Sequence, residues 1–173
     1  MTDTVTIPEG TNKIPDGHAL GPLPLDKIAS MNGMEIMQAM MDMRFPAPPI
    51  MMTMNILMEE AAKGRVVFNG TPGKAHMNPQ GTVHGGWIST IIDSTLSCAV
   101  HTTLEPGELY STTTLNVNMV RPLMATGQKV MCEGRVVHRG RRLATAEGTL
   151  VDAKGKLVAH GSVTCMIFPN PAA

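Results

Sequence analysis

One long helical segment stands among short strand-like runs in this chain, and it constrains the fold more than any other feature. The segment covers roughly residues 84–104, and two short apolar runs joined at Lys63-Gly64 precede it as a hairpin. The expected strands are residues 52–59, 65–71, 111–121, 128–139, 142–152 and 156–168. Short turns between the later runs favour an antiparallel meander. A single long helix must bury its apolar side against one face of such a sheet, so we predict an α+β fold with an antiparallel sheet wrapped around one central helix.

The N-terminal part of the chain has a different pattern. Residues 1–25 are rich in Pro, Gly and Thr without periodicity, which predicts an extended arm. Methionines then recur at threes from Met31 to Met40, which indicates a short amphipathic helix over residues 31–43, followed by a proline-rich loop. We therefore expect an arm with a Met-rich helix over residues 1–50 and a main domain over residues 51–170.

Composition argues against several classes of protein. The chain has 14 basic and 14 acidic side chains, and zero net charge disfavours nucleic-acid binding. The N-terminus has no signal-peptide pattern, and no apolar run approaches the ~20 residues that span a bilayer. Three widely spaced cysteines and no pair of histidines at metal-ligand spacing predict reduced thiols and no metal site. We expect a cytoplasmic protein that binds neither membrane nor nucleic acid and needs no cofactor.

Asp93 is the one charged residue in the middle of the predicted helix. At about 100° per residue, it shares a face with small residues such as Gly86 and Ser97, whereas Trp87 and Ile91 point to the other side. A carboxylate in the middle of a helix caps nothing, and its charge is costly to bury unless it is paired. Either this strip faces solvent, or Asp93 has a function.

The start of the helix favours a function. Gly85 and Gly86 follow His84 and leave the first-turn amides bare of side chains. These amides lack partners within the helix and lie at the positive end of its dipole. Such a helix start suits an oxyanion that develops on a carbonyl oxygen, although a glycine pair also occurs in an ordinary tight turn.

The residues here match a known family. The segment Asn78-Pro79-Gln80-Gly81-Thr82-Val83-His84-Gly85-Gly86, followed by Asp93, closely resembles the motif of PaaI-type acyl-CoA thioesterases. These enzymes belong to the hotdog-fold superfamily that includes 4-hydroxybenzoyl-CoA thioesterase. The similarity runs from about Met51 to Phe168. It implies a hotdog fold, hydrolysis of acyl-CoA to a free acid and coenzyme A, and a dimer, paired into a tetramer, in which the helix carboxylate reaches the substrate across the subunit interface.

The resemblance also implies roles for single residues. The Gly85 amide polarises the thioester carbonyl, and Asp93 acts as general base on water or as nucleophile. Asn78 and His84 match residues that position the water and the thioester, and Gly86 lies in the substrate-binding segment.

Two hydroxyl residues complete the implied site. Ser97 lies one helical turn past Asp93, where the family often has a hydroxyl that orients the water. Thr112 aligns best with a Ser or Thr that recurs near the start of the next strand, although strict alternation places Thr113, Leu115 and Val117 on the core face.

The only dense basic cluster is His138-Arg139-Gly140-Arg141-Arg142. It is either a solvated hairpin turn or the site that holds the phosphates of coenzyme A, because Arg side chains suit phosphate oxygens. We also hypothesise that the Met-rich helix over residues 31–43 covers the acyl pocket, since methionine adapts to varied apolar shapes.

The sequence pattern is also compatible with other functions. A hotdog dehydratase or hydratase would pair its acid with a histidine in a different arrangement. A non-catalytic acyl-CoA-binding protein or a purely structural oligomer would leave Asp93 without a catalytic role.

Overall fold

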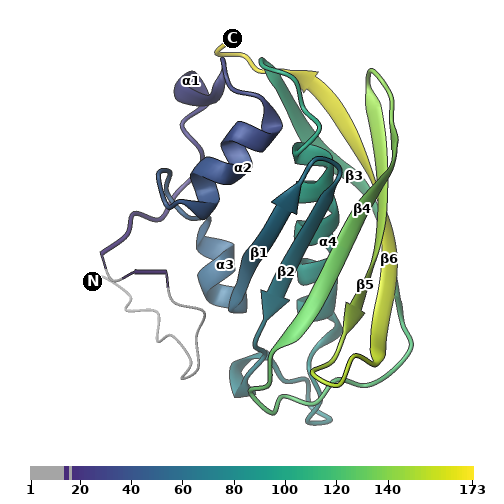
Figure 1. Ribbon diagram of the computed structural model, residues 1–173. Helices are drawn as coiled ribbons and strands as arrows, with labels where there is room; N and C mark the ends of the chain where they lie inside the picture. Colours follow the sequence, from purple (N-terminus) through teal and green to yellow (C-terminus); the bar gives the residue numbers. More distant parts are fainter. Residues whose placement is uncertain (1–13, 16) are drawn as a thin grey trace.

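Figure 1 shows a computed structural model, which describes residues 14, 15 and 17–173. Six strands form one antiparallel sheet in the order β1-β2-β4-β5-β6-β3. The strands are β1 (Ile56–Ala62), β2 (Arg65–Gly70), β3 (Glu108–Met119), β4 (Val130–Arg139), β5 (Leu143–Val151) and β6 (Leu157–Pro169). The sheet curls around α4 (Gly85–His101), which packs against all six strands. This arrangement confirms the predicted α+β hotdog fold.

Helix α4 is the centre of the hydrophobic core. Trp87, Ile88, Ile91, Ile92 and Leu96 are each at most 3% exposed. Burying one such side chain contributes roughly 1.5–3 kcal/mol, so the apolar faces of α4 supply much of the stability of the fold. The long helix predicted over residues 84–104 is therefore confirmed, with its last residues in a turn.

A row of glycines lets the sheet approach α4 closely. Gly134, Gly148 and Gly161 lie opposite one another on β4, β5 and β6. A Cβ atom on Gly134 would lie 3.1 Å from the backbone oxygen of Thr95, and one on Gly161 would lie 3.0 Å from a methyl group of Ile92. Larger residues in this row would push the sheet away from the helix turn that follows Ile92.

The predicted meander is correct for β4, β5 and β6 and wrong for β3. Strand β3 pairs with β6 at the far edge of the sheet, whereas β4 pairs with β2. The connection over residues 120–129 passes beneath the start of α4, where Leu123 accepts the Val83 amide and Met124 bridges to Thr82. Alternation shows which side a residue faces but not which strand lies beside it.

Short helices flank the sheet beside β1. They are α1 (Leu25–Ile28), α2 (Gly33–Met41) and α3 (Pro49–Met54). The predicted Met-rich helix is found as α2, which begins with a capping box between Asn32 and Glu35. Of the arm expected over residues 1–25, residues 1–13 and 16 lie outside the described residues. Residues 14, 15 and 17–24 form no helix or strand.

Helix α3 was not predicted, and the strand expected over residues 52–59 begins only at Ile56. Pro49 occupies the first helical position, where proline is favoured, and methionine is a good helix former. Asn55 then ends the helix in the left-handed conformation with φ 50°. An apolar run of methionines does not distinguish strand from helix, and α3 crosses the boundary expected at residue 50.

A short 3-10 helix, η1 (Lys74–His76), precedes the loop that leads to α4. Among the described residues, no helix combines the length and apolar character needed to cross a membrane.

Candidate active site

The first turn of α4 offers one free backbone donor. His84 is the N-cap, and its Nδ1 accepts the Gly86 amide N–H at 2.8 Å. A ring nitrogen that accepts a hydrogen bond carries no proton, so with Nδ1 as acceptor the ring N–H of His84 is at Nε2. Within the described part of the chain, the Gly85 amide N–H donates to no partner. Gly85 therefore presents its N–H at the positive end of the helix dipole.

A hollow of about 280 Å³ opens at Gly85. Ile88, Met119 and Arg121 contribute to its lining. The Met119 thioether covers Gly85 so closely that a Cβ atom there would lie 3.1 Å from Sδ. A small ligand group can therefore reach the Gly85 amide through this hollow when the flexible Met119 side chain moves.

Asn78 holds the loop before α4 in shape. Its Oδ1 accepts the backbone N–H groups of Gln80 and Thr82, both at 3.1 Å, and its Nδ2 donates to Thr82 Oγ1 at 2.8 Å. The side chain lines the same hollow as Gly85. Most of its hydrogen bonds serve the loop, so its direct effect is to fix the approach to the helix start.

Asp93 is held by a hydroxyl group from β3. It is half-buried, and Thr112 Oγ1 donates to Asp93 Oδ1 at 3.0 Å. The carboxylate has a second oxygen, Oδ2, which can accept a proton or a hydrogen bond from water. The structure thus brings together Asp93 and Thr112, two residues that the resemblance assigned separately to the site.

A β-bulge decides between Thr112 and Thr113. Thr112 lies opposite Cys165 and Thr114 lies opposite Thr164, so Thr113 is the extra residue. Thr113 is exposed, and the expectation that it faces the core is wrong. Because the bulge shifts the alternation by one residue, Thr112 and Val117 lie on the same face of β3 although five positions separate them.

Ser97 has different partners from those expected. Its side chain is 6% exposed, donates to the Ser94 carbonyl at 3.4 Å and hydrogen-bonds with Tyr110. Burial raises the pKa of Tyr110 well above 10, and the nearby Asp93 charge acts in the same direction. Tyr110 therefore stays protonated behind Asp93, and Ser97 orders this hydroxyl.

Two cysteines complete the surroundings of Asp93. Burial raises the pKa of Cys98 to about 12, and the Asp93 charge adds to the shift. Burial also raises the pKa of Cys165, whose Sγ lies 3.9 Å from Thr112 Oγ1. Burial therefore favours the protonated form of both thiols beside Asp93. Local patterns could not reveal the cluster, because it depends on the pairing of β3 with β6.

Gly85 and Asp93 of one chain cannot act on the same carbonyl group. Eight residues separate them along α4, which corresponds to about 12 Å of helix rise. A donor and a base in one reaction must each lie within hydrogen-bond reach of adjacent atoms. The Gly85 amide and the Asp93 carboxylate therefore lie at two separate places along α4.

The basic turn between β4 and β5 contains one engaged and two available arginines. Arg139 forms an ion pair with Glu108 and also donates to the Gly140 carbonyl. Arg141 and Arg142 are exposed and line a hollow of about 580 Å³. Arg139 therefore stabilises the turn, whereas Arg141 and Arg142 are free to bind an anion.

His138 and Gly140 also shape this turn. A Cβ atom on Gly140 would lie 3.1 Å from His138 Nε2, and the Gly140 amide donates to the Leu143 carbonyl at 2.9 Å. The close packing explains a glycine at this position.

The turn between β4 and β5 and the start of α4 lie at opposite ends of the molecule (Figure 1). Glu108, at the start of β3, contacts Arg139, and Met119, at its end, contacts Gly85. Eleven residue steps of β-strand extend about 36 Å. One chain therefore cannot bind the two ends of a short substrate with both features.

Comparisons with known proteins give a consistent result. The model of the family described as the thioesterase superfamily matches residues 80–159. Human acyl-coenzyme A thioesterase 13 is 30% identical over 110 residues, which cover 63% of this chain and 77% of that protein.

Solved structures agree with this match. A phenylacetic acid degradation-related protein from Ralstonia eutropha shares 29% identity with a TM-score of 0.69, covering 75% of this chain and 97% of that one. A mutant of the phenylacetic acid degradation protein PaaI from Thermus thermophilus shares 30% identity with a TM-score of 0.62, covering 68% of this chain and 97% of that one.

Proposed function

Because the chain belongs to the thioesterase superfamily, we propose that it hydrolyses acyl-coenzyme A to a free acid and coenzyme A. The observation that carries this proposal is the pair of features on α4. One is a free Gly85 amide at the helix start, and the other is a half-buried Asp93 carboxylate held by Thr112. A thioester carbonyl is already electrophilic, so one donor to its oxygen and one positioned base are sufficient for hydrolysis.

The chemistry follows from these two groups. The Gly85 N–H donates to the carbonyl oxygen as negative charge develops there. Asp93 either takes a proton from the water that attacks the carbonyl carbon or attacks that carbon itself. The carbon–sulfur bond then breaks, and the departing thiolate of coenzyme A takes up a proton. If Asp93 is the nucleophile, this leaves a mixed anhydride on its carboxyl group, which a water molecule hydrolyses to release the free acid and restore Asp93. His84 Nε2–H lies at the helix start and can donate to the bound thioester.

The distance between Gly85 and Asp93 supports a site shared by two subunits. Strand β3 is a sheet edge with exposed apolar side chains, Leu115 at 37% and Met119 at 47%. Open edges of this kind pair readily with a second chain. If two β3 strands pair antiparallel about an axis near Leu115 and Asn116, Met119 of the partner subunit lies opposite Thr112. The partner subunit's Gly85 then comes beside Asp93.

The same arrangement gives the basic turn a role. Glu108, which holds Arg139, lies four residues from Thr112 along β3, or about 13 Å. Arg141 and Arg142 then lie on the same side of the shared site as Asp93. Their exposed guanidinium groups suit the phosphates of coenzyme A, with room for the pantetheine arm in between. A tetramer would form from two such dimers.

A panel of acyl-CoA substrates with a thiol-detecting reagent tests the proposal. We expect thiol release from at least one aryl-, short- or medium-chain acyl-CoA, and Asp93→Asn should lower kcat by about a hundred- to ten-thousandfold. The variant should keep the melting temperature of the parent. Binding of acyl-CoA without thiol release would refute hydrolysis and favour a non-catalytic binding protein. Full activity of Asp93→Asn would refute the mechanism.

A further inference from the structure

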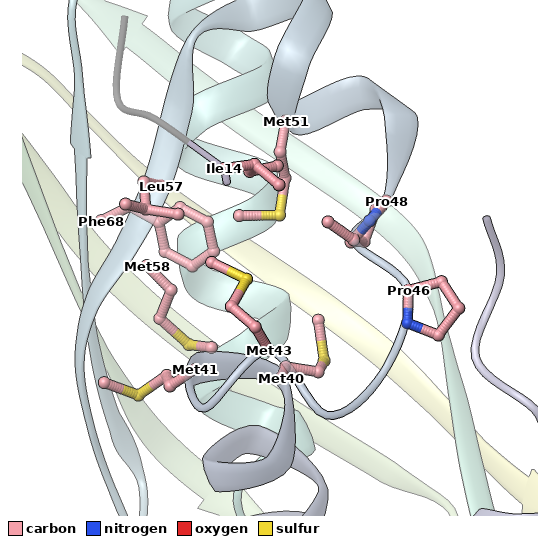
Figure 2. Close-up of a pocket in the computed structure, with 11 residues that line it drawn as sticks. Ile14, Met40, Met41, Met43, Pro46, Pro48, Met51, Leu57, Met58 and Phe68 are labelled. Atoms are coloured by element: carbon pink, nitrogen blue, oxygen red, sulfur yellow. The ribbon is translucent and has the colours of Figure 1, made fainter. Parts of the chain in front are cut away.

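A cavity of about 100 Å³ lies between helices α2 and α3 and strands β1 and β2. Methionines supply much of its lining, namely Met40, Met41, Met43, Met51 and Met58. Figure 2 shows the thioethers of Met43 and Met51 beside the ring of Phe68. Among the described residues of the lining, no side chain carries a charge or a hydroxyl, amide or amine group. A cavity lined only by apolar groups favours apolar ligands over water.

The chain already places one hydrocarbon group in this cavity. Ile14 is 8% exposed and lines the cavity, whereas Pro15 and Gly17 are exposed. Among the described residues of this segment, Ile14 alone contributes a side chain to the cavity, beside Met51 (Figure 2). A hydrocarbon chain of a ligand can displace the Ile14 side chain without breaking an ion pair or a hydrogen bond, because this side chain forms neither.

Helix α3 connects the cavity to the start of α4. Met51 lines the cavity, and Met54, almost one turn later, lines a second hollow of about 320 Å³ together with His84 and Gly86. Trp87 Nε1 donates to the Met54 carbonyl at 2.7 Å and so ties α3 to α4. One face of α3 thus borders the apolar cavity, and its end borders the helix start.

We propose that this cavity binds an unbranched hydrocarbon chain. A ring with a hydroxyl substituent would lose hydrogen bonds to water and find no partner in the described lining, which is costly. Methionine side chains have three rotatable bonds and can separate to admit a flexible chain longer than the present cavity. The chain is either the acyl group of the thioester, in which case the inference rests on the proposed function, or a free fatty acid.

Decanoate titrated into the purified protein, followed by calorimetry, tests binding directly. Met51→Trp should fill the cavity and raise the Kd of decanoate about tenfold, whereas Ile14→Ala should lower it severalfold. Ile50→Trp is the matched control, since Ile50 lies on the same helix, is 46% exposed and does not line the cavity. Cyclohexanecarboxylate should bind more weakly than decanoate to the parent protein.

Hydrolysis of decanoyl-CoA and acetyl-CoA distinguishes the two sources of the chain. If the acyl group of the substrate occupies the cavity, Met51→Trp raises KM for decanoyl-CoA and leaves that for acetyl-CoA unchanged. If only decanoate binding weakens, the inference holds with a free fatty acid as ligand. If the parent hydrolyses no acyl-CoA but Met51→Trp still abolishes decanoate binding, the proposed function fails and the cavity remains a chain-binding site. Decanoate binding that is absent, or unchanged in both Met51→Trp and Ile14→Ala, overturns the inference.

Discussion

At the scale of single residues, Gly85 matters for its backbone rather than for its missing side chain. It is the first residue of α4, where proline is well tolerated, and its N–H has no partner among the described residues. Gly85→Pro therefore removes the proposed donor while the helix is retained. We expect kcat to fall by about a hundred- to thousandfold and the melting temperature to stay close to that of the parent, as measured by steady-state kinetics and calorimetry.

Gly85→Ala is the matched control for this change. It retains the N–H, and its Cβ atom meets only the end of the flexible Met119 side chain. Activity of this variant should stay much closer to that of the parent. Equal losses in both variants would show that crowding at Gly85, and not the N–H, limits the reaction.

Thr112 shows how far sequence reasoning reaches at this scale. The Asp93 carboxylate and the Gly85 helix start could be predicted, because helical phase and the motif are local. The hydrogen bond from Thr112 to Asp93 depends on a bulge at Thr113, and the alternating pattern of β3 contains no sign of it. The ordering of Tyr110 by Ser97 depends on contacts between distant segments in the same way.

At the scale of elements, His101 makes the end of α4 sensitive to acid. It is 6% exposed, its Nε2 has no hydrogen-bond partner in the described part of the chain, and its ring lies 5.1 Å from that of Tyr110. Burial lowers the pKa of His101 from 6.5 to about 4. Between these values the unfolded chain binds the proton and the folded chain does not, so stability falls as the pH falls.

His101→Phe tests this dependence and preserves a ring beside Tyr110. In the parent, the free energy of unfolding should fall by about 2 kcal/mol between pH 7 and pH 4.5 because of His101. Urea denaturation across this range should give a flatter profile for His101→Phe. Below about pH 4.5, Glu59 and Glu133, whose pKa values are lowered by basic partners, add their own losses. Parallel profiles above that pH would contradict the assignment to His101.

The elements themselves were predictable to different degrees. Helix α4 and strands β2, β4, β5 and β6 follow from periodicity and turn residues. Helix α3 was missed because the Met-Met-Thr-Met run of residues 51–54 has no pattern that separates a helix from a strand, and the limits of the helix come from Pro49 and Asn55. The glycine row of Gly134, Gly148 and Gly161 has meaning only once strand pairing places the three residues opposite one another.

At the scale of the whole molecule, the proposed mechanism requires a second copy of the chain. The Gly85 amide and the Asp93 carboxylate differ by about 12 Å along α4, and the open β3 edge runs beside both. Symmetric dimers repeat every residue on both sides of the axis, so each dimer would have two shared sites. Each site would take its donor from one subunit and its carboxylate from the other.

Two inactive variants should therefore restore activity when they are mixed. Asp93→Asn damages the carboxylate half of a site, and Gly85→Pro damages the donor half. In a mixed dimer, one site receives both defects and the other receives none. After random exchange of subunits, half of the dimers are mixed and half of their sites are intact, so we expect roughly a quarter of the parent activity.

The mixing experiment needs subunit exchange, for example by co-expression of differently tagged chains and isolation of the mixed species. Each variant alone, treated identically, sets the baseline, and the isolated mixed dimer should have about half the parent activity because one of its two sites is intact. If Gly85 and Asp93 acted within one chain, every chain in the mixture would carry a defect and no activity would return. If each variant keeps the melting temperature of the parent, as we expect, a failure to recover activity would count against the shared site and not against folding.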